Sequence, residues 1–305
     1  MEFVRTPDSN FENLPDFPYE PHYLEWNSLR VAHIDEGPKD GPVALLMHGE
    51  PTWSYLYRKM IPGLVAEGYR CIAPDHVGFG RSDKPVDDNW YVIERHCERT
   101  RHLIETLDLQ DITIFVQDWG GPTGLRQVVD MPDRFSRLVI MNTWLHHAGY
   151  EYTSGVKMWH DASTNPFWLG WMRGVLPVGR IMATALMRPG QDKAAVEAAY
   201  EAPFAKGAES RAGARRFPWC LPHWQPEEGN AADQERCFEA LKTLGLPTHF
   251  IFANADMVFT EEWGRKWHAQ MPGSTFDVVE GAGHFLQEEA GEEIVEMFLA
   301  RRDEK

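Results

Sequence analysis

Short apolar runs alternate with helix-periodic stretches over the first 143 residues of the chain. Strands are predicted over residues 29–34, 43–47, 70–73, 112–116 and 138–141, and helices over residues 56–66, 91–107 and 125–131. Two of the runs, VALLM and ITIFV, are apolar at consecutive positions, as expected of strands buried on both faces. This alternation predicts an α/β fold with a mostly parallel sheet and helices on both of its faces.

The pattern changes between residues 144 and 225. Strand signals vanish there, Trp, Met, Ala and Arg dominate, and helices are broken at Pro166, Pro177, Pro189 and Pro203. Strand patterns return over residues 248–253 and 275–280, and a closing helix is predicted over 287–301. We therefore expect a helical cap, residues 144–225, inserted into an α/β core formed by residues 1–143 and 226–305.

Composition and charge narrow the functional classes. A chain of 305 residues can bury a large core without disulfides or metal. The net charge of −16 disfavours nucleic acid and anionic membranes as main partners. Four cysteines without CxxC spacing indicate free thiols in a reducing cytoplasm. The N-terminus does not resemble a secretory signal and no apolar run is long enough to span a membrane, so we expect a cytoplasmic protein.

The most informative motif is Val-Gln-Asp-Trp-Gly-Gly at residues 116–121, between a predicted strand and a predicted helix. A strand–turn–helix elbow exposes the side chain at its apex, and here that residue is Asp118. A carboxylate nucleophile suits displacement at a saturated carbon, which leaves an alkyl ester that water can hydrolyse. The alternative is that Asp118 only caps the helix that follows it.

Two further loops follow predicted strands. His-Gly-Glu-Pro-Thr-Trp at residues 48–53 could supply the N–H of Glu50 to an oxyanion hole, together with the N–H of Trp119. Gly-Ala-Gly-His at residues 281–284 projects His284 at the same sheet edge. In the order nucleophile, acid, histidine, the acid is expected at Asp256. Taken alone, the first of these loops also fits an ordinary turn.

Cofactor motifs are weak. Gly-Phe-Gly-Arg-Ser-Asp at residues 78–83 lacks the third glycine of a dinucleotide-binding loop and is interpreted as a turn beside the site. The sequence contains no P-loop, no HExxH and no zinc spacing of Cys and His. We expect no metal and no other cofactor.

Together, the three motifs resemble the α/β-hydrolase fold, although Val116 stands where a small residue is usual two positions before the nucleophile. Within that fold, HGEPTW, VQDWGG and GAGHFLQE are similar to the haloalkane dehalogenases that carry Glu after His-Gly. The resemblance spans nearly the whole chain, cap included. It implies an eight-stranded sheet and a reaction that releases an alcohol, a halide ion and a proton without a cofactor.

The resemblance also implies roles for individual residues. Asp118 would attack the halogen-bearing carbon, and His284, oriented by Asp256, would activate the water that hydrolyses the ester. The backbone N–H groups of Glu50 and Trp119 would form the oxyanion hole. The indoles of Trp119 and of a cap tryptophan would hold the halide.

The second halide donor is assigned by the resemblance to Trp171, with Trp168 as its packing partner. The alternative is that both are cap core, since aromatic side chains at helical spacing usually pack. Further residues are expected to line a substrate pocket, or else to be core: Phe167, Trp168, Phe217, Trp219, Leu221, Val258 and Leu286.

Other functions remain open at this point. An epoxide hydrolase shares the aspartate nucleophile but uses cap tyrosines as acids, for which Tyr150, Tyr152 and Tyr200 are available. A fluoroacetate-type dehalogenase would need an arginine pair after the nucleophile, where this chain has only Arg126. A non-catalytic binding protein would normally lack a triad member. The expected partners are a small haloalkane, water and halide, and the chain is expected to be a monomer.

Overall fold

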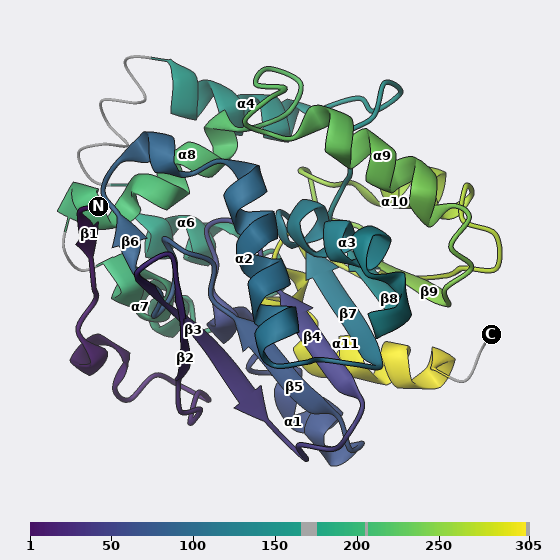
Figure 1. Cartoon of the computed structure of the whole chain (residues 1–305), viewed down its shortest axis with the longest axis horizontal. Coiled ribbons are helices and arrows are strands. Elements are labelled where there is room, and N and C mark those ends of the chain that lie inside the picture. The colour runs from purple at the N-terminus through teal and green to yellow at the C-terminus, as the bar shows by residue number, and fades with distance from the viewer. Residues whose placement is uncertain (166–175, 205–206, 303–305) are drawn as a thin grey trace.

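The computed structural model of the chain describes residues 1–165, 176–204 and 207–302. Its centre is an eight-stranded sheet in the order β10-β9-β8-β7-β4-β5-β3-β2 (Figure 1). The strands span β2 His22–Trp26, β3 Leu29–Glu36, β4 Val43–Met47, β5 Arg70–Pro74, β7 Ile112–Gln117, β8 Phe135–Met141, β9 Thr248–Ala253 and β10 Thr275–Val279. Pairing is parallel from β10 to β5 and antiparallel for β3 and β2. The predicted mostly parallel eight-stranded sheet is confirmed.

Helices cover both faces of this sheet. Those of the core are α1 Ile61–Ala66, α2 Ile93–Thr106, α3 Gly120–Asp130, α9 Ala231–Leu241, α10 Glu261–His268 and α11 Leu286–Arg301. Helices α2 and α3 pack on each other on one face, whereas α1 and α11 meet on the other (Figure 1). Strands β4 and β7 are buried at every position, which is why their apolar runs carry no polar alternation.

The segment predicted as a cap is helical where the structure describes it. Its helices are α4 Ser154–Thr164, α6 Val178–Ala185, α7 Lys193–Glu201 and α8 Ala212–Trp219. Pro177 immediately precedes α6, and Pro203 follows α7, as the break positions predicted. Pro166 lies outside the described residues. These helices gather at one end of the molecule, and α4 packs on α8 (Figure 1).

Several element boundaries differ from the sequence prediction. The helix expected over residues 56–66 is a 3-10 turn, Ser54–Tyr57, followed by the short α1, whose first turn contains Pro62. Helix α3 begins at Gly120, five residues before the predicted start, because it follows the elbow directly. Strand β2 and the two-residue pair β1 Phe3–Val4 and β6 Lys84–Pro85 had no sequence prediction.

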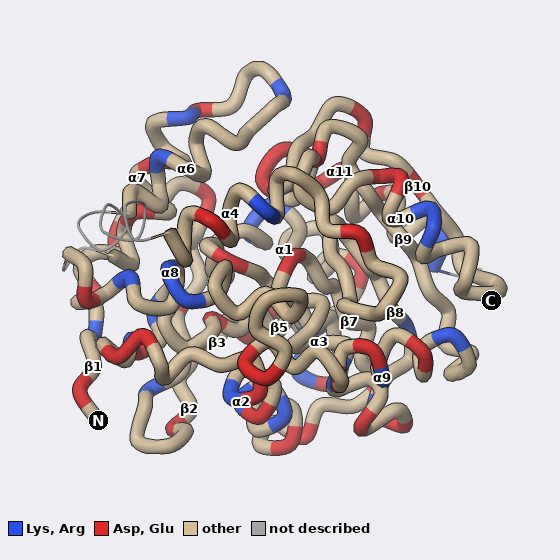
Figure 2. Tube along the Cα trace, turned by 90° about the horizontal axis from the view of Figure 1, so that it is seen from above, with Lys and Arg blue, Asp and Glu red and all other residues tan. Residues whose placement is uncertain are grey.

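The remaining short helices are 3-10 turns. They span Asp8–Phe11, Asp88–Trp90, Pro132–Arg134, Ala202–Phe204 and Gly207–Arg211. All four cysteines are free and buried. Within the described residues, no helix is both long and apolar enough to cross a membrane. Asp and Glu are spread along the trace, and many lie close to Lys or Arg (Figure 2), so the negative net charge belongs to the surface as a whole.

Candidate active site

The predicted elbow is present between β7 and α3. Asp118 sits at its apex with a φ of +51°, a left-handed conformation that is uncommon for a residue with a side chain. The turn passes very close to β4, since a Cβ on Gly120 would lie 2.1 Å from the carbonyl oxygen of Met47. Only glycine fits there. A strained apex of this kind is a common feature of functional sites.

The carboxylate of Asp118 lies between the two other predicted loops. Its Oδ1 accepts the backbone N–H of Glu50 at 2.7 Å, and its Oδ2 lies 3.5 Å from Nε2 of His284. Gly49 makes this approach possible, because a Cβ there would lie 2.2 Å from Oδ1. The side chain is only slightly exposed, at 8%. An acceptor-only carboxylate is thus held by one amide with its second oxygen facing an imidazole.

His284 is oriented by the predicted acid. Its Nδ1 donates to Oδ2 of Asp256 at 2.9 Å, while Oδ1 of Asp256 accepts the backbone N–H of Val258. Burial alone would lower the pKa of His284, but the carboxylates of Asp256 and Asp118 outweigh it and raise the pKa to about 10. The imidazole of His284 is therefore protonated at neutral pH.

His48 is held in the neutral form by its own loop. The backbone N–H of His76 donates to Nε2 of His48, so that nitrogen must be an acceptor, and Nδ1 donates to the carbonyl of Gly49. Burial lowers the pKa of His48 to about 3. In return, Nε2 of His76 donates to the carbonyl of His48, and the ring of His96 packs on His76. His48 thus fixes the loop that carries Glu50.

A pocket of about 220 Å³ opens above Asp118. Its core side is formed by Glu50, Pro51, Asp118, Trp119, Trp144, Met257, Val258, Phe259, His284 and Phe285. Its cap side is formed by Gly155, Val156, Met158, Trp159, Ile181, Ala185, Pro218 and Leu221. The lining is mostly apolar apart from two carboxyl groups and an imidazole, which suits an apolar ligand with one reacting centre.

Two tryptophan side chains of this lining come from different parts of the fold. Trp119 follows Asp118 and packs edge-on against Trp144, at 4.7 Å between ring centroids. Trp159 reaches down from α4, and its indole N–H donates to Oε2 of Glu50 at 2.9 Å. Burial is the main reason that the pKa of Glu50 lies well above its ordinary range; the indole opposes this rise and the charge of Asp118 adds to it.

Comparisons with known proteins identify the fold and the family of the chain. Residues 42–291 match the family model described as alpha/beta hydrolase fold. Haloalkane dehalogenases of Psychrobacter cryohalolentis and Mycobacterium marinum are each 39% identical to the chain; the alignments cover 98% of it and 97% and 99% of the relatives. The chain belongs to the haloalkane dehalogenase family.

A solved structure extends the comparison to the backbone. The tetrameric haloalkane dehalogenase DpaA from Paraglaciecola agarilytica NO2 superposes with a TM-score of 0.87 at 36% identity, covering 98% of both chains. The likeness therefore includes the cap as well as the sheet. Since that relative is a tetramer, the monomer expected for this chain stays a prediction.

Within this haloalkane dehalogenase family member, the predicted pocket residues fall into three groups. Val258 and Leu221 line the pocket. Phe217, Trp219 and Leu286 are not among the lining residues: Phe217 packs behind Trp119 at 5.4 Å, and Leu286 is fully buried at the start of α11. Phe167, Trp168 and Trp171 lie outside the described residues, so the assignment of Trp171 as halide donor stays a prediction.

Trp159 is one of the pocket residues that the sequence analysis did not single out. Thr153 caps α4 by accepting the N–H of Val156, and its hydroxyl donates to the carbonyl of Val258, which ties the helix start to the loop after Asp256. Val156 and Trp159 then stand three residues apart on one helix face, over the pocket. The three-residue spacing of Val156 and Trp159 could have indicated a shared helix face, but Trp168 and Trp171 have the same spacing in the sequence.

The tyrosines that an epoxide hydrolase would need lie away from the pocket lining. The hydroxyl of Tyr200 donates to Glu288, that of Tyr152 pairs with His146, and Tyr150 packs edge-on against Trp263. None of the three tyrosines is among the residues that line the pocket. An epoxide hydrolase is therefore not favoured.

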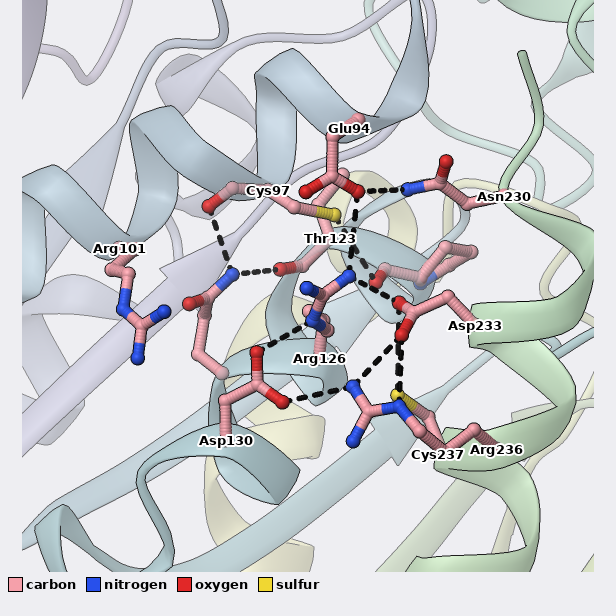
Figure 3. A network of polar contacts seen from close by, with 12 residues as sticks. Glu94, Cys97, Arg101, Thr123, Arg126, Asp130, Asn230, Asp233, Arg236 and Cys237 are labelled. Atoms are coloured by element: carbon pink, nitrogen blue, oxygen red, sulfur yellow. Dashed lines mark hydrogen bonds and ion pairs between the residues drawn. The ribbon is translucent and has the colours of Figure 1, made fainter. Parts of the chain in front are cut away.

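Arg126, the arginine considered for a fluoroacetate-type site, does not line the pocket either. Figure 3 shows it among carboxylates of α2, α3 and α9, where it contacts Glu94, Asp130 and Asp233. Arg236 bridges the last two of these. The network braces three core helices and offers no cation to a carboxylate substrate in the pocket.

Proposed function

We propose that this chain hydrolyses small haloalkanes to an alcohol, a halide ion and a proton. The observation that carries the proposal is the setting of Asp118, a carboxylate at a strained elbow in an apolar pocket, with an amide on one oxygen and an imidazole near the other. Family membership adds independent support, since the relatives are named haloalkane dehalogenases.

In the first half-reaction, an oxygen of Asp118 attacks the halogen-bearing carbon in line with the leaving group. The carbon–halogen bond breaks, its electron pair leaves with the halide, and an alkyl ester forms on Asp118. The indole N–H groups of Trp119 and Trp159 receive the developing charge in a pocket of low polarity. In this proposal Trp159 is the cap donor because its ring lines the pocket beside Asp118; its N–H, which donates to Glu50, would turn to the halide when substrate binds. Trp171, the donor predicted from the sequence, is the alternative.

In the second half-reaction, water attacks the ester carbonyl. Esterification removes the charge of Asp118, which is one cause of the raised pKa of His284. The imidazole, still oriented by Asp256, then gives up its proton and accepts one from water. The amides of Glu50 and Trp119 stabilise the oxyanion. Collapse of the tetrahedral intermediate breaks the bond between the acyl carbon and the alkyl oxygen, which takes the proton from the imidazolium and leaves as the alcohol. The remaining carboxyl proton passes to the imidazole, which restores the carboxylate of Asp118.

The lining favours a short or medium-length apolar substrate. The 220 Å³ volume is closed at its base by Asp118 and His284 and has no Lys or Arg among the lining residues. The lining therefore has no lysine or arginine to pair with an anionic substrate. Terminal bromoalkanes such as 1-bromobutane and 1,2-dibromoethane are the natural first choices.

The activity is tested by halide and acid release from these two bromides, with styrene oxide as the competing substrate. We expect release from both bromides and no opening of the epoxide. Silence with the bromides together with turnover of the epoxide would overturn the proposal.

The covalent step is tested by His284→Phe. We expect this variant to release one equivalent of halide and then stop, with intact mass increased by one alkyl group. Loss of halide release without a mass increase would contradict the division of labour between Asp118 and His284.

A further inference from the structure

Glu289 is a buried carboxylate near the pocket that the proposed reaction leaves without a role. This residue, 7% exposed, lies in the first turn of α11, before the break in helical geometry at Ala290. Its two oxygens accept three backbone N–H groups, those of Gly283, Met187 and Arg188. Such charge-assisted bonds are stronger than bonds between neutral groups. Glu289 therefore joins two chain segments about a hundred residues apart.

The first segment is the loop that carries His284. The amide of Gly283, one residue before the imidazole, donates to Oε1 of Glu289 at 2.8 Å. From the core side, Asn142 donates to the carbonyls of Gly283 and His284, and Gln117 donates to that of His284. The loop is thus held by core side chains through its carbonyls and by Glu289 through its amide.

The second segment belongs to the cap and follows α6. Met187 and Arg188 donate to Oε2 of Glu289, and Ala185, two residues earlier, lines the pocket. The two segments touch: a Cβ on Gly283 would lie 2.7 Å from Cγ of Met187 and 3.0 Å from the carbonyl oxygen of Ala185. The cap side of the pocket and the histidine loop therefore meet without room for a methyl group.

Arg188 gives the cap segment an additional attachment through its side chain. The guanidinium pairs with Glu293 at 2.6 Å and donates to the carbonyl of Glu280. Glu293 is partly exposed, at 38% of its side chain. Glu293 thus binds the cap segment through Arg188, whereas Glu289 binds the cap segment and the histidine loop together. The two functions can be separated by mutation.

We propose that Glu289 is a positioning residue that couples the docked cap to His284. With the cap segment in place, the shared carboxylate holds the Gly283 amide and so keeps the imidazole aligned on Asp118 and the attacking water. The inference rests on the proposed function, because it assigns Glu289 to the half-reaction in which His284 acts. Attack of Asp118 on the haloalkane does not depend on this alignment.

The test is Glu289→Gln, followed by rapid quench with 1-bromobutane. The variant keeps the shape of the side chain, but its NH₂ group cannot accept, so at least one of the three amides loses its partner. We expect decay of the alkyl adduct, measured by intact mass, to slow about tenfold, because small displacements of a catalytic group are costly. First-turnover halide release should be unchanged. A purely structural weakening would not separate the two steps in this way.

The matched control is Glu293→Gln, which loosens the same cap segment without touching the histidine loop. It should hydrolyse the adduct at the wild-type rate. Equal slowing in both variants, or wild-type decay in Glu289→Gln, overturns the inference. If His284→Phe traps an adduct while Glu289→Gln behaves as wild type, only this inference fails; if no adduct forms in any variant, the proposed function fails.

A second variant approaches the same contact from the loop. Gly283→Ala places a methyl group against Met187 and the Ala185 carbonyl and so forces the cap segment and the loop apart. If Glu289→Gln does not fold, Gly283→Ala tests the coupling in its place. We expect Gly283→Ala to show slow adduct decay and normal first-turnover halide release. Normal decay in a folded Gly283→Ala variant would contradict the coupling.

Discussion

The core side and the cap side of the pocket are built on different principles. On the core side, Asp118, Glu50 and His284 come from three separate loops, and each is fixed by hydrogen bonds to residues distant in sequence. On the cap side, the lining from α4 and α6 is apolar, and the indole of Trp159 makes its polar contact across the pocket, to Glu50. The contrast indicates that the core determines the chemistry, whereas the cap determines what reaches it.

The largest effect should come from the core side. Asp118→Asn removes the nucleophile while keeping the size of the side chain, and we expect halide release to fall by at least about 10⁴-fold, as for other triad members. Halide release from 1,2-dibromoethane measures this, with a thermal melt to verify folding. Retention of more than a few per cent of the activity would show that the carboxylate is not the nucleophile.

The next largest effect is expected for Trp159, a cap residue whose indole contacts Glu50 of the core. Trp159→Phe removes one indole donor, and loss of one preorganised donor usually costs about 10²–10³-fold in rate. We expect a reduction of that order in first-turnover halide release. Trp224→Phe is the matched control, because Trp224 is a cap tryptophan that stacks on His160 and is not a lining residue. Equal behaviour of the two variants would move the donor role back to Trp171.

The third effect separates the two half-reactions by pH. Asp118 contributes to the raised pKa of His284, so in the ester the pKa of His284 should lie below about 10. Since the neutral imidazole is the base, adduct hydrolysis should rise about tenfold per pH unit below that pKa and then level off. The rate of first-turnover halide release should not show this rise with pH. Single-turnover measurements of halide release and adduct hydrolysis from pH 5 to 10 test both expectations. The same rise with pH in both rates would contradict the scheme.

The smallest effect is expected at the pocket mouth. Met158 and Met257 line the pocket yet are 68% and 73% exposed, and leucine has a similar volume. Met158→Leu and Met257→Leu should change KM for 1-bromohexane by no more than about threefold and leave kcat unchanged. A large change in kcat would place the mouth in the chemistry and weaken the contrast between the two sides. Met131→Leu, outside the lining, is the control.

The sequence predicted the core side far better than the cap side. Asp118, Asp256 and His284 each follow a strand whose apolar run is visible in the sequence, so a local pattern suffices to bring them to one sheet edge. The start of α3 was placed too late, because no propensity rule marks a helix that begins inside an elbow.

The packing of the cap helices on the core could not be predicted from the sequence. Which tryptophan faces the pocket depends on how α4 docks, and the hydrogen bond of Thr153 to Val258 decides that. The position of Phe217 behind Trp119 likewise depends on the packing of a cap helix, in this case α8. Strand β2 was missed because it is an edge strand, mostly exposed or half-buried, with a weak alternation of polar and apolar residues.

The cluster of His48, His76 and His96 behind the Glu50 loop has a consequence for the stability of the whole molecule. Burial lowers the pKa of all three, and the buried guanidinium of Arg99 lowers each further. Unfolding returns them to about 6.5. Their contribution to stability is therefore present above that pH and is lost as the pH falls below it, because the unfolded chain takes up protons that the folded chain refuses.

Each of these histidines should steepen the acid side of the stability curve by about 1.4 kcal/mol per pH unit, the value for one proton. His96→Phe should flatten it by that amount, and denaturant titrations between pH 6.5 and 4.5 measure the difference; an unchanged slope would mean that His96 is charged in the fold. The loop that presents Glu50 to Asp118 thus packs on three histidines whose protonation in acid favours the unfolded chain.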